Sequence, residues 1–235
     1  SINYLSKDKF LIMWNSGWDN LFEKTNWGEY PPEELIRFIA SKFYKEKDRS
    51  SIKILEIGCG TGANIWYLSR EGFNAYGLDG SKVAISKAEE RLNRESLKYN
   101  IVHADAVEIP FKNNFFDAVI DIECLYANNL KSTNRIINEI YRVLKNNGYF
   151  FSKTFMTGMS GSETGIRLKG EKNTFLKMED SPLHNEYGLI RLTSEEEIPL
   201  IYGKFKKLTW DYMHRTKNNK KEKIGEWLIT CCKVT

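Results

Sequence analysis

Residues 53–63, with the sequence KILEIGCGTGA, constrain the fold of this chain more than any other segment. A short apolar run rich in isoleucine predicts a buried strand, and it ends in three closely spaced glycines at 58, 60 and 62. Apolar residues then resume at helical spacing through Leu68, so the segment predicts a strand, a glycine turn and a helix. Glycine allows positive φ and lets a ligand approach without meeting a Cβ atom. In an open parallel sheet, nucleotide-like ligands bind beyond this end of the strand.

Length and composition favour one α/β domain with a sizeable core, because the chain has 235 residues and a hydrophobic content of 41%. We expect a soluble protein without a membrane span, since no long apolar run occurs. Residues 1–8 carry no signal pattern, which favours a cytoplasmic location. The net charge of +4 gives nucleic acid only weak support as a partner. The cysteines at 59, 124, 231 and 232 have no metal-type spacing, so reduced thiols and no metal are expected.

Acidic residues follow the next expected strands. Residues 74–79 predict a second strand that ends at Asp79, and residues 101–106 predict a third strand that runs into Asp105. Residues 116–122 predict a fourth strand, again with carboxylates at its end. Because the ends of parallel strands meet at one edge of a sheet, these acids are expected to lie close to the glycine turn.

The second half of the chain contains two more helices and three more strands by pattern. Ser132 is expected to cap a helix that stops near Gly148, and a fifth strand covers 149–155. Thr193 and Glu196 resemble a capping box.

Two final strands are expected at about 205–212 and 226–234. The lysine-rich connection 217–223 is most simply a solvated loop, although it also suits contact with a polyanion. Residues 156–192 are rich in Gly, Ser, Lys and Glu and read as a long loop, which in a compact domain is usually functional or disordered. No internal repeat and no second core are expected.

Two families share the glycine turn. The G-x-G-x-x-A pattern of residues 58–63 satisfies the loose dinucleotide fingerprint. The E-x-G-x-G-x-G pattern of residues 56–62 resembles the first motif of class I S-adenosylmethionine (SAM)-dependent methyltransferases. Residues 105–106 resemble the acid and small-residue pair of that family, which a dehydrogenase does not need. The resemblance covers roughly residues 50–155, so an NAD-dependent oxidoreductase is the weakest alternative.

The resemblance implies a Rossmann-like α/β fold: a seven-stranded, mostly parallel sheet with helices on both faces and an antiparallel C-terminal hairpin. It implies SAM as cofactor and S-adenosyl-L-homocysteine as product. In the family, the acid matching Asp79 binds both ribose hydroxyls, and the acid matching Asp105 accepts a hydrogen bond from the adenine amine. One or two N-terminal tryptophans are expected to close over the sulfonium cation. The expected cofactor-binding residues are Trp14, Trp18, Trp27, Glu56, Gly58, Cys59, Gly60, Asn64, Asp79, Gly80, Ser81, Asp105, Ala106, Val107, Asp121 and Tyr126.

The expected organisation is a single domain, 1–235, in four parts. Residues 1–46 form an aromatic-rich helical cap and residues 50–155 the SAM-binding core. Residues 156–192 form an insertion, interpreted as a substrate lid because the family often covers its acceptor with this segment. Residues 193–235 supply the last helix and the hairpin.

Methyl transfer from SAM is an in-line displacement, so alignment of the reactants is the main requirement. A base is needed only for a weakly acidic acceptor such as a sugar hydroxyl. The candidate bases are Glu123 and Asp121 at the end of the fourth strand and His184 in the lid, with His184 and Glu123 preferred. Asp121 has an alternative role in orienting the cofactor. Glu123 has an alternative role as the partner of a lid arginine, and His184 has an alternative as an exposed residue.

Three residues are candidates for binding the acceptor: Tyr30, Arg167 and Arg191. A guanidinium group can bind a phosphate or carboxylate through two parallel hydrogen bonds. Both arginines also suit ordinary surface positions.

Residues 27–35 resemble the same region of small bacterial methyltransferases of surface-polysaccharide synthesis. That resemblance predicts O-methylation of a small polar acceptor, such as a sugar, a phosphoramidate or another capsule precursor. An RNA or protein methyltransferase and a non-catalytic SAM-binding module stay as alternatives. The expected partner is a small molecule or glycan precursor, not nucleic acid.

Overall fold

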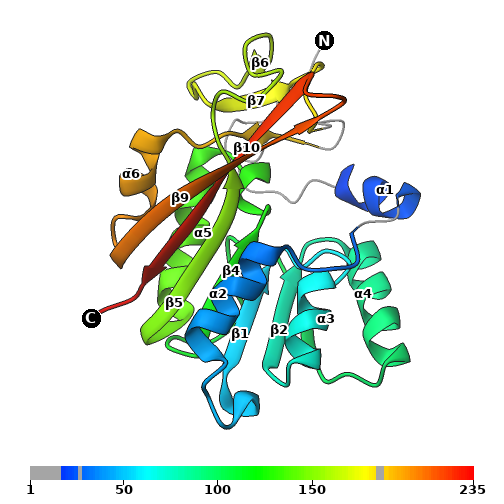
Figure 1. The fold of residues 1–235 in the computed structure, drawn as a ribbon, viewed down its shortest axis with the longest axis vertical. Coiled ribbons are helices and arrows are strands. Elements are labelled where there is room, and N and C mark those ends of the chain that lie inside the picture. Colours follow the sequence, from blue (N-terminus) through cyan, green and yellow to red (C-terminus); the bar gives the residue numbers. More distant parts are fainter. Residues whose placement is uncertain (1–16, 26–27, 184–187) are drawn as a thin grey trace, which may run out of the picture.

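A computed structural model describes residues 17–25, 28–183 and 188–235 (Figure 1). Its centre is a seven-stranded sheet in the order β3-β2-β1-β4-β5-β10-β9. Strands β1 to β5 pair in parallel, whereas β10 is antiparallel to both β5 and β9. The strands are β1 (Lys53–Ile57), β2 (Asn74–Asp79), β3 (Asn100–His103), β4 (Phe116–Ile122), β5 (Leu144–Phe155), β9 (Lys206–Lys217) and β10 (Glu222–Cys232). The predicted mostly parallel sheet with an antiparallel C-terminal hairpin is confirmed.

Helices cover both faces of this sheet, as expected (Figure 1). They are α1 (Gly17–Lys24), α2 (Glu33–Phe43), α3 (Ala63–Arg70), α4 (Lys82–Arg94), α5 (Leu130–Val143) and α6 (Ile198–Tyr202). Within the described ranges, no helix combines the length and the apolar character that crossing a bilayer requires.

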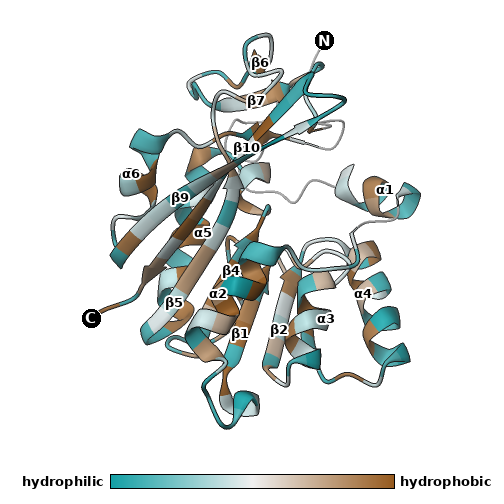
Figure 2. Cartoon of the chain, viewed as in Figure 1, coloured by the Kyte–Doolittle hydropathy of each residue, from teal (hydrophilic) through white to brown (hydrophobic). Residues whose placement is uncertain are grey.

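Apolar side chains form a separate layer on each face of the sheet. On one face, Ile140 of α5 and Tyr202 of α6 pack with Phe150 of β5 in a single buried cluster. On the other face, Ile39 of α2 and Ile65 of α3 belong to a second cluster. Burying a side chain of this size stabilises the fold by about 1.5–3 kcal/mol. Figure 2 shows the apolar residues concentrated along β1 and β4, the strands that end at the glycine turn and beside it.

Two predicted helix caps are wrong by one to three residues. The side chain of Asn129, not Ser132, caps α5 by accepting from the Ser132 amide at 2.8 Å. The capping box is formed by Ser194 and Glu197, one residue after the predicted pair. In both places a second good capping residue lies within one turn, so local propensity does not choose between them.

The hairpin strands are longer than expected. They extend to Lys217 and begin again at Glu222, so the exposed hairpin loop is present but shorter than expected, at residues 218–221.

The insertion after β5 is folded, and this corrects the expectation of a long loop. It contains a three-stranded sheet, β6 (Ile166–Arg167), β7 (Thr174–Lys177) and β8 (Ile190–Arg191). Phe175 and Met178 of the insertion pack with Ile224 of β10 in a third apolar cluster. The expectation that no second core exists is therefore wrong at this end of the molecule.

Candidate cofactor and acceptor site

The glycine turn has the backbone geometry that the sequence predicts. Gly58, Gly60 and Gly62 have φ values of 64°, 50° and 80°. A Cβ atom on Gly58 would lie 2.5 Å from the Cys124 Sγ atom, so a side chain cannot be accommodated there. Gly62 is the left-handed N-cap of α3. The turn therefore exposes main chain at the carboxyl end of β1, beside Cys59.

Asp79 accepts hydrogen bonds from the glycine turn and from the turn that follows β2. It ends β2, and its Oδ2 atom accepts from the Gly60 amide at 2.8 Å while Oδ1 accepts from the Ser81 amide at 2.8 Å. Burial raises its pKa, against the opposing effect of these two amides. Each carboxylate oxygen can accept further hydrogen bonds, so the group fits a pair of ribose hydroxyls.

Glu56 and Asn64 form a buried polar pair beneath the turn. The Asn64 Nδ2 atom donates to Glu56 Oε1 at 2.6 Å, while Glu56 Oε2 and Asn64 Oδ1 are buried with no hydrogen-bond partner among the described residues. The pKa of Glu56 is raised to about 8, mainly by burial; Asp79 and Asp121 add to this shift, and the Asn64 hydrogen bond opposes it. A cationic amino group would relieve this repulsion and satisfy the oxygens, so these residues fit SAM. The same carboxylates would repel a pyrophosphate, which argues against a dinucleotide.

The pair expected to read adenine lies next to Asp79. The Ala104 amide donates to the Asp79 carbonyl at 3.0 Å, and Asp105 Oδ1 accepts from the Val107 amide at 3.0 Å. Ala106 and Val107 are buried. A groove of about 630 Å³ begins at Asp105 and runs outward past Arg142.

His103, the last residue of β3, contacts the turn that follows β2. Its Nε2 atom lies 2.9 Å from the carbonyl oxygen of Gly80, which fixes the turn after β2.

Asp121 supports the turn at the end of β4. It is fully buried and accepts from the Cys124 amide, the Leu125 amide and the Ser152 hydroxyl, at 2.9, 3.0 and 2.6 Å. Burial raises its pKa to about 6. Its contacts therefore position the main chain between β4 and Tyr126.

Glu123 begins a chain of buried charges that runs away from the site. It has a positive φ of 59°, and its carboxylate pairs with Lys153 Nζ at 2.5 Å. The same Nζ atom lies 2.6 Å from Glu226, which Arg215 approaches at 3.5 Å. Burial raises the pKa of Glu123, although Lys153 opposes the shift. The partner of Glu123 is thus a lysine of β5, not an arginine of the lid.

Lys153 and Glu226 were not among the sequence-predicted site residues. The available signal was a lysine within the apolar run YFFSKTF of β5, where a charge needs a partner. The identity of that partner was not accessible, because Glu226 is 73 residues away in sequence.

Helix α1 contacts residues that follow β2 and residues that follow β4. Asp19 accepts a hydrogen bond from the Ser81 hydroxyl. Trp18 lies between Phe22 at 6.2 Å and Tyr126 at 6.4 Å, measured between ring centroids. Trp18 is therefore placed over the space between the glycine turn and the end of β4. Trp14, Trp27 and His184, which the sequence also singled out, lie outside the described residues.

The structure does not bring the three predicted acceptor-binding residues together. Tyr30 is exposed and packs on Trp66 of α3. Arg167 donates to two carbonyl groups inside the insertion. Arg191 is 1% exposed, donates to the Thr193 hydroxyl at 3.1 Å, and leaves its Nε atom without a hydrogen-bond partner among the described residues. Their role toward an acceptor stays a prediction.

The sequence around the glycine turn matches a known family model. Residues 55–152 match the model for a methyltransferase domain. The matched segment contains the glycine turn, Asp79, Asp105 and Asp121, so the acidic site described above lies within it.

Curated relatives share this segment with the chain. An uncharacterized protein of Methanocaldococcus jannaschii is 37% identical over 116 residues, 49% of this chain and 44% of that protein. The fatty-acid O-methyltransferase of Mycolicibacterium smegmatis is 29% identical over 145 residues, 56% of this chain and 52% of that protein. The sterol 24-C-methyltransferase erg6 of Aspergillus fumigatus is 28% identical over 144 residues, 59% of this chain and 37% of that protein. The chain thus spans about half or less of the length of these relatives.

Solved structures support the fold. A SAM-dependent methyltransferase from Methanosarcina mazei superimposes with a TM-score of 0.69 at 21% identity, over 84% of this chain and 98% of that one. The phosphoethanolamine N-methyltransferase 2 of Haemonchus contortus, in complex with SAM, gives a TM-score of 0.64 at 18% identity, over 93% of this chain and 56% of that one.

Proposed function

We propose that the protein is a SAM-dependent methyltransferase that acts on a small-molecule acceptor. The observation that carries this proposal is the set of three buried carboxylates, Glu56, Asp79 and Asp121, around a glycine turn within the matched segment. Burial raises the pKa of each of them, so a ligand with a sulfonium and an ammonium group would stabilise their ionised forms.

SAM, when bound, supplies a methyl group on a positively charged sulfur. The residues of the chain hold and align this donor. Glu56 and Asn64 would hold the amino group, Asp79 the ribose hydroxyls and Asp105 the adenine amine. Trp18 and Tyr126 would cover the reacting centre and exclude water. Holding two reactants in line is worth an effective molarity of ~10⁵–10⁸ M.

Glu123 is the described residue best placed to accept a proton from the acceptor. It follows β4 directly, in the turn that Asp121 supports, and its side chain is 31% exposed, so an acceptor can reach it. A raised pKa makes its carboxylate a stronger base than an exposed glutamate. An acceptor oxygen would lose its proton to Glu123 as it forms the bond to the methyl carbon.

The acceptor is the least constrained part of the proposal. The names of the relatives include enzymes for fatty acids and sterols, and a structural neighbour acts on phosphoethanolamine. The sequence-based expectation of an oxygen on a sugar, phosphoramidate or similar precursor stays a prediction. The polar Glu123–Lys153 pair supports a hydroxyl-bearing acceptor.

Isothermal titration of SAM tests the cofactor assignment. Asp79→Ala removes the ribose ligand and the anchor of the Gly60 amide, so we expect SAM affinity to fall roughly 100-fold or more. Asp117→Ala is the matched control, because Asp117 accepts from the Lys53 amide at the opposite end of the sheet. Equal affinities for SAM in Asp79→Ala and Asp117→Ala, with both folded, would refute the assignment.

A panel of acceptors, with S-adenosyl-L-homocysteine as the measured product, tests catalysis separately. Product formed with sugar or lipid acceptors and lost in Glu123→Gln supports the enzyme. SAM binding without product formation from any acceptor or cell extract would favour a non-catalytic binding module.

A further inference from the structure

The positive charge of the molecule is concentrated at the tip of the β9–β10 hairpin. Residues 213–223 carry five basic side chains and one acidic side chain, a net charge of +4 that equals the net charge of the whole chain. The remaining residues therefore carry no net charge. The basic residues are Arg215, Lys217, Lys220, Lys221 and Lys223, all of them exposed.

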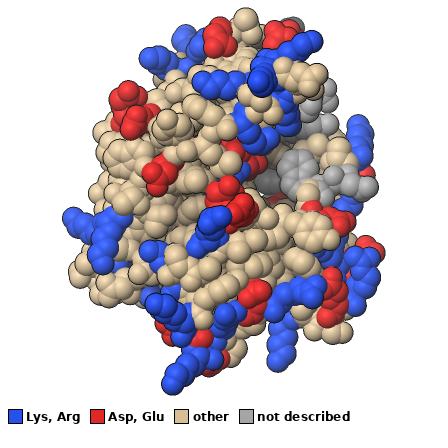
Figure 3. All heavy atoms as spheres, viewed as in Figure 1, with Lys and Arg blue, Asp and Glu red and all other residues tan. Residues whose placement is uncertain are grey.

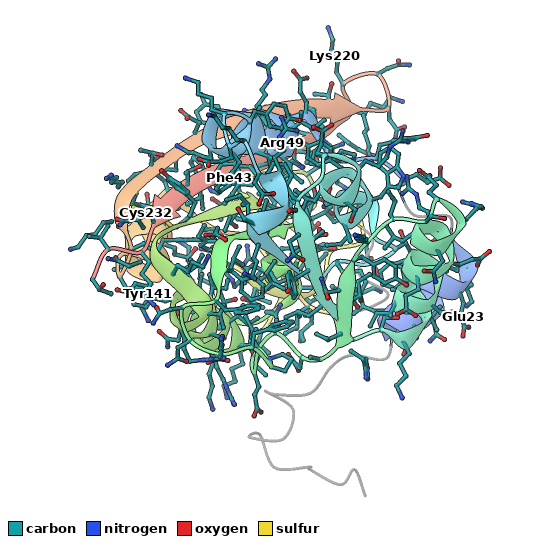
Figure 4. All side chains as sticks on the ribbon, turned by 90° about the horizontal axis from the view of Figure 1, so that it is seen from below. Glu23, Phe43, Arg49, Tyr141, Lys220 and Cys232 are labelled. Carbon is teal, nitrogen blue, oxygen red and sulfur yellow. The ribbon has the colours of Figure 1, made fainter. Side chains whose placement is uncertain are left out.

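The hairpin tip is joined to the folded insertion. The Ser160 amide donates to the Lys223 carbonyl at 3.0 Å, and the Lys223 amide donates to the Ser160 hydroxyl at 2.8 Å. Ile224 lies in the apolar cluster of the insertion. Figure 1 places the tip, β6 and β7 at the same end of the long axis, and Figure 3 shows several Lys and Arg side chains there, with a few Asp and Glu side chains among them. Figure 4 shows Lys220 pointing away from the body of the molecule.

Two large aliphatic side chains are exposed at the same end. Ile166 of β6 is 58% exposed and Leu176 of β7 is 49% exposed, whereas their neighbour Phe175 is buried. Lys177, the register partner of Ile166, is also exposed. The surface thus presents branched aliphatic groups beside a cluster of lysines.

We propose that this end of the molecule, residues 213–223 with β6 and β7, docks on an anionic lipid bilayer. Lysines attract the anionic headgroups, and the aliphatic side chains enter the boundary of the acyl layer. A lysine keeps its ammonium group at the headgroups while its stem lies along apolar surface. RNA fits less well, because isoleucine and leucine cannot stack on bases as aromatic side chains do. The docking is independent of the acceptor, and it would place the insertion next to the bilayer.

Vesicle co-sedimentation of the full chain tests the proposal. We expect binding to vesicles of phosphatidylglycerol and phosphatidylcholine, little binding to phosphatidylcholine alone, and weaker binding as salt is raised. The variant K217S/K220N/K221S should lower the partition coefficient on the order of 100-fold, about fivefold for each lysine. The matched control K45S/K47S/K98S removes three exposed lysines distant from the hairpin and should stay close to the unsubstituted protein.

A second pair of variants tests the aliphatic contact. Ile166→Ser should weaken vesicle binding about fivefold. Leu200→Ser, at the 81% exposed position of α6, should have no effect. Unchanged SAM affinity and melting temperature show that each variant is folded.

Three outcomes would overturn the proposal. They are absence of binding to anionic vesicles, equal losses in the two lysine variants, and binding of single-stranded RNA at a salt concentration where vesicles are not bound. Each is distinguishable from failure of the methyltransferase assignment, which the SAM titration reports.

Discussion

At the scale of single residues, burial of carboxylates dominates the site. Glu56, Asp79 and Asp121 are 2%, 4% and 0% exposed, and burial raises the pKa of each. Asp79 and Asp121 each accept two hydrogen bonds from backbone amides, which offset part of the free-energy cost of burying a carboxylate. Glu56 accepts only from the Asn64 side-chain amide, and its pKa is raised to about 8. The protein without cofactor therefore keeps Glu56 protonated at neutral pH, and a cationic ligand beside it would favour the ionised form.

The pKa of Glu56 predicts how stability depends on pH. Between its ordinary value of 4.5 and about 8, the folded protein holds a proton that the unfolded chain releases. Stability contributed by this group is complete below pH 4.5 and is lost as the pH rises toward 8. Glu56→Gln keeps the acceptor for Asn64 and has no proton to lose. We therefore compare the free energy of unfolding in urea at several pH values. As the pH rises from 5 to 7.5, the difference between the variant and the unsubstituted protein should grow by about 3 kcal/mol in favour of the variant.

Glu90→Gln, an exposed position of α4, controls for replacing a carboxylate by an amide. A stability difference between Glu56→Gln and the unsubstituted protein that does not change with pH would contradict the prediction.

At the scale of elements, the start of α3 is fixed by a close contact with α4. Gly62 has φ +80°, and a Cβ atom there would lie 2.8 Å from the Ala88 Cβ atom. Gly72, after α3, has a similar φ of +85° but nothing within 4 Å of an added Cβ. The two glycines therefore separate the cost of backbone strain from the cost of a steric clash.

We predict different stability losses at the two glycines. Gly72→Ala should cost about 1 kcal/mol, since only the left-handed backbone is penalised. Gly62→Ala should cost an additional 1–3 kcal/mol or so, because overpacking is added to the same strain. Urea unfolding measures both, and G62A/A88G should regain the additional loss. Equal losses for Gly62→Ala and Gly72→Ala would show that the contact between the helices is not restrictive.

At the scale of the whole molecule, the hairpin connects the main sheet to the insertion. Ile229 of β10 packs in the main cluster, while Ile224 of the same strand packs with the insertion. One strand therefore belongs to two cores, and the insertion depends on β10 for its apolar contacts.

Truncating Ile224 should loosen the insertion selectively. Ile→Ala at a fully buried position costs about 2–5 kcal/mol, and in Ile224→Ala this loss falls on the apolar cluster that includes Met159, Phe175 and Met178 of the insertion. Hydrogen exchange should become at least tenfold faster in that segment, with β1 and β4 unchanged. In Ile229→Ala the core strands should be affected instead. The prediction fails if both variants change exchange in the same regions.

The sequence alone determined the fold class and which residues meet at the centre of the candidate site. The glycine turn, Asp79 and Asp105 are predictable because each lies in a short contiguous segment and follows a parallel strand. The carboxyl ends of neighbouring parallel strands converge by geometry, so no distant contact has to be known.

Only the tertiary structure decided the charges beside the acceptor region and the architecture of the insertion. Lys153 joins Glu123 and Glu226 across 30 and 73 residues, through pairing of β5 with β4 on one side and with β10 on the other, which no local pattern specifies. Arginine is usually found on the surface, yet Arg191 lies in β8 and is buried. Such positions follow from register and packing between segments far apart in the chain, because burial is a property of the assembled layers and not of any single segment.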